Sequence, residues 1–103
     1  MQVIDAFSAG EMLVLTEYNC EGIEEPWAFP LDVAEDLTRR ENVSSSQFRD
    51  RTRRARIKLR RGDIAVVIRS VHLNHPTIDA FYVVLVSSMK VCVYPHFLER
   101  VGV

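Results

Sequence analysis

Positively charged side chains occupy every second position of residues 54–60, and this pattern is the best candidate for binding chemistry in the sequence. In a β-strand such residues share one face and stand about 7 Å apart, a spacing that resembles that of phosphates along a single nucleic-acid strand. Arginine dominates over lysine, and its planar guanidinium binds phosphate or carboxylate through two parallel hydrogen bonds. The predicted binding residues are Arg49, Arg51, Arg53, Arg54, Arg56, Lys58, Arg60 and Arg61.

Two interpretations of this basic segment, residues 39–61, stay open. The segment either binds a charged partner, or its charge is neutralised or simply solvated within the same molecule. Phe48 is the only aromatic residue among its arginines, so the segment itself offers little support for stacking on nucleic-acid bases.

An acidic segment, residues 1–38, precedes the basic one and contains no lysine or arginine, although the whole chain has a net charge of only −1. Its carboxylates either imitate a row of phosphates and occupy a basic groove on another protein, or they belong to a solvated loop and a helix N-terminus. The predicted acidic partner face consists of Glu21, Glu24, Glu25, Asp32, Glu35 and Asp36.

Signals of catalysis and of metal binding are weak. The sequence contains no glycine-rich phosphate loop and no nucleophile elbow, and the three serines at 44–46 are typical of a helix cap or a loop. A zinc site needs several converging nitrogen or sulfur ligands, and His72 and His75 lie at an expected turn, with Cys92 and His96 later. The sequence therefore predicts no enzymatic activity, no cofactor and no metal site.

Cysteine content and hydropathy predict a cytoplasmic protein, from a bacterium or a phage-infected host cell. Cys20 and Cys92 are far apart and are typical of two reduced thiols. The longest apolar run, residues 80–86, is much shorter than the roughly 20 residues that span a bilayer. The N-terminus does not resemble a signal peptide, so no membrane contact is expected.

Strands are expected at both ends of the chain. Residues 64–71, 80–86 and 91–94 are rich in β-branched residues and are separated by short links, which predicts an antiparallel meander. A further strand is expected over residues 12–16. Gly10 with Glu11, and Gly62 with Asp63, precede two of these runs in the same way and predict two equivalent strand entries.

A long connection lies between these strands. Residues 19–30 are expected to form a loop that Trp27 and Phe29 pin to the core. Asp32 and Glu35 fit a capping box, which predicts a short helix at about 33–40. A helical turn near 45–52 and a strand over 54–60 are expected to follow.

Consecutive apolar residues in the β runs indicate strands that are buried on both faces. A small barrel buries only its interior, so something must cover its outer face. Either the long connection does so, through Trp27, Phe29, Val33 and Leu37, or a second copy packs against it as a homo-oligomer.

The C-terminal part of the chain has the expected order strand, turn, strand, short turn and strand, and then Tyr94, Pro95, His96 and Phe97 lead into a last aliphatic-acidic stretch. This part of the chain resembles the Src-homology-3 barrel. The resemblance covers residues 62–103 and the first strand. It implies a mostly β domain over residues 1–103, a five-stranded antiparallel barrel with one short helix in its first connection. The aromatic motif of the peptide-binding members is absent, since Tyr18 stands alone, and a phage or bacterial barrel with an elaborated first loop is the closer likeness.

These features together predict a non-enzymatic binding module that works through charge. A protein–protein accessory or inhibitor role of the kind that small phage proteins play comes first. Nucleic-acid binding through residues 49–61 is the alternative, and a structural virion or ring subunit is the third.

Overall fold

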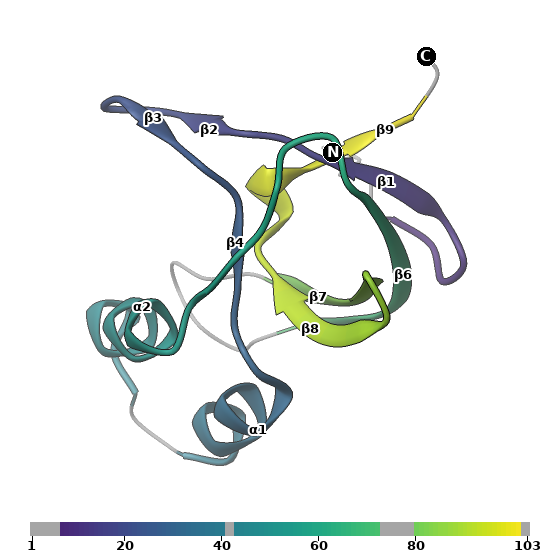
Figure 1. The fold of residues 1–103 in the computed structure, drawn as a ribbon. Helices are drawn as coiled ribbons and strands as arrows, with labels where there is room; N and C mark the ends of the chain where they lie inside the picture. The colour runs from purple at the N-terminus through teal and green to yellow at the C-terminus, as the bar shows by residue number, and fades with distance from the viewer. Residues whose placement is uncertain (1–6, 41–42, 73–79, 102–103) are drawn as a thin grey trace, which may run out of the picture.

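The fold is mostly β, with antiparallel sheets and two helices (Figure 1). A computed structural model describes residues 7–40, 43–72 and 80–101. The main sheet has the strand order β8-β7-β6-β1-β9, and its strands are β1 (Met12–Leu15), β6 (Ile64–His72), β7 (Ala80–Val86), β8 (Met89–Val93) and β9 (Leu98–Arg100). Figure 1 shows this sheet curling around the core, with both helices on one side of it.

The expected meander is confirmed as β6, β7 and β8. Ser87 and Ser88 connect β7 to β8 as a two-residue turn with φ of 48° and 67°, the left-handed values that match the twist of a tight hairpin. A register shift between Val67 and Arg69 interrupts the ladder of β6 with β7. The expected turn at residues 74–77 lies outside the described residues.

The two strand entries are confirmed as equivalent. Gly10 and Gly62 adopt φ of 87° and 86°, which side chains with a Cβ rarely tolerate. The Gly10 amide donates to the Val67 carbonyl at 2.7 Å, and the Gly62 amide donates to the Leu15 carbonyl at 2.8 Å. Each glycine therefore closes one end of the β1–β6 pair, whose register is Met12 with Val66 and Val14 with Ile64.

The long connection contains short strands and two helices, which corrects the expected single helix. These elements are β2 (Tyr18–Asn19), β3 (Ile23–Glu24), β4 (Trp27–Ala28), α1 (Leu31–Arg39), α2 (Ser45–Arg54) and β5 (Ile57–Lys58). The helix α1 starts at Leu31, so Asp32 lies inside its first turn and the predicted capping box with Glu35 does not form. The capping box belongs to α2 instead, where Ser44 and Gln47 bond reciprocally.

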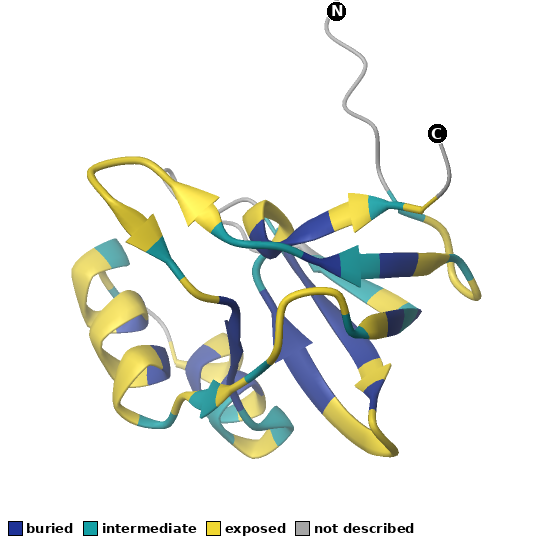
Figure 2. Cartoon of the chain, turned by 45° about the horizontal axis from the view of Figure 1, so that its top comes forward, coloured by how far each residue is buried: buried dark blue, intermediate teal, exposed yellow. Residues whose placement is uncertain are grey.

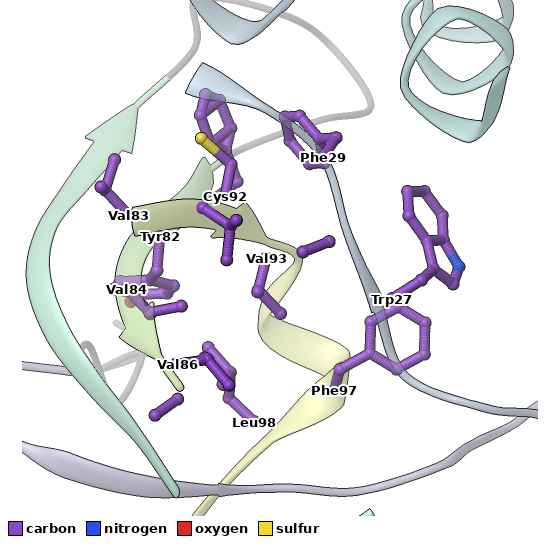
Figure 3. Close-up of a cluster of buried hydrophobic side chains, with 14 of the residues drawn as sticks. Trp27, Phe29, Tyr82, Val83, Val84, Val86, Cys92, Val93, Phe97 and Leu98 are labelled. Atoms are coloured by element: carbon purple, nitrogen blue, oxygen red, sulfur yellow. The ribbon is translucent and has the colours of Figure 1, made fainter. Parts of the chain in front are cut away.

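Aromatic side chains of the connection cover part of the outer face of the sheet. Phe29 pairs through its backbone with Cys92, and its ring lies 5.3 Å from that of Phe81. Phe48 of α2 adds a further contact with Phe81 at 6.1 Å. All four residues are buried, and Figure 3 shows Trp27 and Phe29 beside the strands of the core. The prediction that the connection covers the sheet is therefore correct for this part of the face.

Elsewhere on the outer face, some apolar side chains are left exposed by the described residues; Figure 2 colours each residue by its burial. Met12, Ile64 and Leu85 are 56%, 41% and 42% exposed, although they belong to three adjacent strands of the sheet. Within the described ranges no helix is long and apolar enough to cross a membrane.

Candidate anion-binding surface

The helix α2 presents four of the predicted cationic side chains. Phe48 and Thr52, one turn apart, are buried and fix the inner face of the helix. Arg49, Arg51, Arg53 and Arg54 are exposed on the remaining faces. The predicted strand over 54–60 is thus wrong at its start, because the capped helix continues through Arg54 before the chain extends.

The alternating pattern survives beyond the helix. Arg56, Lys58 and Arg60 are exposed, while the residues between them are half-buried. Only Ile57 and Lys58 form a ladder, with Lys58 opposite Trp27 of β4, and the Leu59 amide donates to the Pro26 carbonyl at 3.0 Å. These bonds hold the cations on one side of an extended segment, as the period-two pattern predicts.

Half of the predicted acidic face is engaged with these cations. Arg61 pairs with Glu17 and binds Glu25 through two hydrogen bonds, which hold the pKa of the Glu25 carboxyl below its usual value. Arg53 lies 3.2 Å from Glu24.

Asp36 completes the contact between the two segments. Its Oδ2 is shared by Arg40 at 3.2 Å and Arg51 at 3.5 Å, in both cases as a contact between charges without a regular hydrogen bond. The acidic and basic segments therefore touch and neutralise each other in part.

Four predicted cations have no ion pair with any acidic side chain of the described ranges. We call Arg49, Arg56, Lys58 and Arg60 the open cations. Arg54, by contrast, pairs with Asp50 of its own helix at 2.7 Å. On the acidic side, Glu21, Asp32 and Glu35 are exposed and form no ion pair within the same ranges. Each segment therefore keeps some charged side chains that form no ion pair with a described residue, and these lie on different parts of the fold.

Three aromatic rings that sequence analysis did not connect lie beside α2. The Thr52 hydroxyl of α2 lies 3.0 Å from the hydroxyl of Tyr94. Tyr94 directly precedes the 3₁₀ turn η1 (Pro95–Phe97), so this hydrogen bond connects the helix to the start of that turn. The Tyr94 and His96 rings are stacked at 5.7 Å, and Tyr18 of β2 lies 4.1 Å from His96. No local pattern could reveal this cluster, because Tyr18 is separated from Tyr94 and His96 by more than 70 residues.

The charge of Arg49 acts on all three rings, and the charge of Glu24 acts on Tyr18 and His96. Hydrogen bonding with the Cys20 thiol raises the pKa of Tyr18, and burial raises the pKa of Tyr94, while the charge of Arg49 opposes both shifts. Packing against neighbouring rings removes water from part of His96 and lowers its pKa; the charge of Glu24 opposes this decrease, and the charge of Arg49 adds to it. The imidazole is therefore neutral at pH 7.

Trp27 fixes the opposite end of the cluster. Its Nε1 donates to Glu24 at 3.0 Å, and the Arg53 guanidinium lies over its ring at 5.7 Å. Its ring also meets Tyr94 edge-on at 5.6 Å, and it is buried. Arg53 thus contacts Trp27 and Glu24, whereas Arg49 forms no ion pair with a described acidic side chain.

Possible metal ligands, a buried thiol and a surface hollow are the other features of the described part of the chain. No three His, Cys, Asp or Glu side chains gather there as metal ligands; His75 and the side chain of His72 lie outside the description. Burial raises the pKa of the Cys92 thiol to about 12, which makes it a poor nucleophile. A hollow of about 210 Å³ between the helices is lined by Leu37, Arg40, Val43, Gln47, Asp50 and Arg51.

No protein-family model, no curated protein and no solved structure matches this chain. Its function must therefore be inferred from the geometry of its own surface.

Proposed function

We propose that this chain is a non-enzymatic binding module whose ligand is a nucleic acid, held through the open cations. The main support is the charge that remains after internal pairing: Arg49, Arg56, Lys58 and Arg60 have no acidic partner among the described residues. Exposed cations of this kind attract a polyanion and release its counter-ions on binding.

The arrangement of the open cations favours an extended ligand over a small anion. Arg56, Lys58 and Arg60 follow one another along an extended segment, and Arg49 lies on the preceding helix α2. None of them lines the hollow between the helices. A polyanion with regularly spaced charges, such as a nucleic-acid backbone, suits such a ridge.

Nucleic-acid binding now ranks above the inhibitor role that the sequence favoured. The inhibitor role needs a free acidic face, and Glu24, Glu25 and Asp36 are engaged by arginines of the same chain. The remaining carboxylates of that face are only three: Glu21 precedes β3, and Asp32 and Glu35 lie on α1.

The test is a charge reversal on the ridge, Arg56→Glu with Arg60→Glu. Affinity for a mixed-sequence oligonucleotide is measured by fluorescence anisotropy between about 0.05 and 0.3 M salt. Wild type should show a logarithmic salt slope of about −0.7 per phosphate contacted on a single strand, and the variant should bind at least tenfold more weakly with a shallower slope.

A matched control carries the same charge change elsewhere. Arg69 of β6 and Lys90 of β8 are exposed cations without an ion pair to a described acid, and Arg69→Glu with Lys90→Glu gives the same net charge as the ridge variant. This control should lose much less affinity. Equal losses in the two variants, or binding that does not depend on salt, would contradict nucleic-acid binding at the ridge.

A protein partner is the second candidate, and the open outer face of the sheet supports it. Met12 and Val66 are opposite each other in neighbouring strands, and Val66 is opposite Leu85, so they form one apolar row beside Ile64. A second copy packed on this row would make the chain a homo-oligomer, and a ring or virion subunit would need a further contact surface as well. Light scattering should then give a molar mass that rises with concentration and returns to the monomer value in Leu85→Arg.

We also propose that the curved sheet is a small barrel of the Src-homology-3 type. Two features support this: the last strand, β9, pairs with the first, β1, and one turn of 3₁₀ helix at Pro95–Phe97 precedes β9. In this architecture the elaborated first connection carries all the open cations.

A further inference from the structure

The three rings beside α2 form a continuous stack that reaches the surface. Tyr94 stacks on His96 with an interplanar angle of 11°, and His96 meets Tyr18 at 4.1 Å with an angle of 31°. Tyr94 is half-buried, His96 is exposed, and Tyr18 at the end of the stack is 37% exposed. The stack thus begins against the core and ends at solvent.

Neighbouring contacts hold the inner rings of this stack firmly. Tyr94 is anchored by the Thr52 hydroxyl at 3.0 Å and by the edge of Trp27 at 5.6 Å. His96 has the edge of Phe97 against it at 4.2 Å. A ring that is already fixed loses little conformational freedom when a ligand stacks on it, which favours binding.

An open cation lies next to the stack. Arg49 is one helical turn before Thr52, whose hydroxyl bonds both the Arg49 carbonyl and Tyr94. The charge of Arg49 acts on Tyr18, Tyr94 and His96, and the Glu24 carboxylate opposes it at Tyr18 and His96. Arg53, the next residue on this helix face, is committed to Glu24, which leaves Arg49 as the cation beside the rings.

We propose that the ligand is a single-stranded nucleic acid, with a base extending the Tyr94–His96–Tyr18 stack and the adjoining phosphate bound by Arg49. This inference rests on the proposed nucleic-acid binding and specifies its substrate class. An aromatic ring next to a cation is the arrangement by which proteins hold unpaired bases. In a duplex the base faces are covered by their neighbours, so an exposed ring stack selects strands whose bases are free.

The experiment compares Tyr18→Leu with Tyr18→Phe on a single-stranded and a double-stranded oligonucleotide of the same sequence. Leucine keeps apolar bulk against His96 but removes the ring, whereas phenylalanine keeps the ring. Tyr18→Leu should weaken single-strand binding roughly tenfold and leave duplex binding unchanged, while Tyr18→Phe should bind both as wild type does. Ile23→Ser, an exposed apolar position on the same hairpin, is the matched control and should change neither affinity.

An abasic strand with the same phosphates provides a second readout. Wild type should bind it about as weakly as Tyr18→Leu binds the intact strand, and Tyr18→Leu should not distinguish the two strands. Equal losses on single strand and duplex in Tyr18→Leu would mean that the ring only supports the fold, and would overturn the inference.

Other outcomes separate this inference from the function on which it rests. If wild type binds single strand and duplex equally and Tyr18→Leu is harmless, the stacking inference fails and nucleic-acid binding stands. If neither oligonucleotide binds, both fail. A polyglutamate chain that binds as tightly as the single strand would assign the surface to an acidic protein instead.

Discussion

The acidic and basic segments have opposite charge in the sequence, but they also differ in how the fold holds them. The basic segment contains a capped helix, α2, whose Phe48 and Thr52 are buried. Of the described carboxylates before it, three lie on α1 and one on β3, and the others lie in turns and loops. Half of the predicted acidic face pairs with the basic segment. Segregated charge in a sequence therefore becomes partly recombined charge in the fold, and the cations left over define the surface available to a partner.

In the basic segment, the contacts that hold it in place are also distinct from the charges that it exposes. Exposed ion pairs contribute little to stability, whereas buried aromatic contacts contribute much. The basic segment should thus depend on its apolar face for position and on its cations for function. The following predictions test this division, beginning with the largest effect.

Phe48→Ala should destabilise the protein most. The ring is buried and contacts Phe29 at 6.4 Å, Phe81 at 6.1 Å and Tyr94 at 6.5 Å, so its removal leaves a cavity between α2 and the sheet. We expect the free energy of unfolding to fall by about 3–5 kcal/mol, measured by urea denaturation. Phe48→Leu, which refills much of the space, should lose clearly less. A loss below about 1 kcal/mol in Phe48→Ala would mean that ion pairs, and not packing, hold the helix.

Ser44→Ala tests the start of the same helix and should have an intermediate effect. The Ser44 side chain accepts from the Gln47 amide at 3.2 Å, and the Gln47 side chain accepts from the Ser44 amide at 2.9 Å. Loss of this cap should cost about 1 kcal/mol, while Ser44→Asp, which retains an acceptor, should cost much less. If alanine and aspartate behave alike, the cap does not set the start of α2.

The strands could be predicted from the sequence because their signals are local. Residues 80–86 were expected as a strand and are one, and Gly10 and Gly62 marked their turns correctly, since positive φ restricts the residue type. The length of α2 was underestimated because Arg54, Ala55 and Arg56 alternate with their neighbours as in a strand. The cap at Ser44 and the burial of Phe48 and Thr52 override that weak pattern.

The candidate site could be predicted only in part. Its arginines are visible as a cluster in the sequence, but which of them are neutralised depends on tertiary contacts, such as that of Arg61 with Glu17 and Glu25. The ring stack was missed for the same reason, because β2, η1 and α2 meet only in the folded chain. Phe48, the one aromatic residue that sequence analysis weighed for stacking on bases, is buried and unavailable.

Arg60 and Arg61 give the finest test, because they are adjacent in sequence and differ in pairing. Arg61 binds Glu17 and Glu25, whereas Arg60 is an open cation. Arg61→Gln should lower the melting temperature slightly at low salt and hardly at all at 0.5 M salt, because Arg61 and Glu25 are exposed, Glu17 is half-buried, and salt screens such pairs. Arg60→Gln should leave the melting temperature unchanged at either salt concentration, yet weaken nucleic-acid binding. Equal effects on stability would show that internal pairing does not distinguish the two arginines.

The pH dependence of the difference in melting temperature between wild type and Arg61→Gln tests whether the Glu25 carboxyl group causes it. Hydrogen bonding with Arg61 lowers the pKa of Glu25 in the folded protein from 4.5, so the folded state holds its proton less tightly than the unfolded state. The resulting stabilisation is complete above pH 4.5 and is lost as the pH falls through the lowered pKa. Thermal denaturation should therefore distinguish wild type from Arg61→Gln at pH 7, and the two should converge in acid. A difference that persists after the pH has fallen far enough to protonate Glu25 in the folded state would assign the role of Arg61 to packing of its side chain and not to its charge.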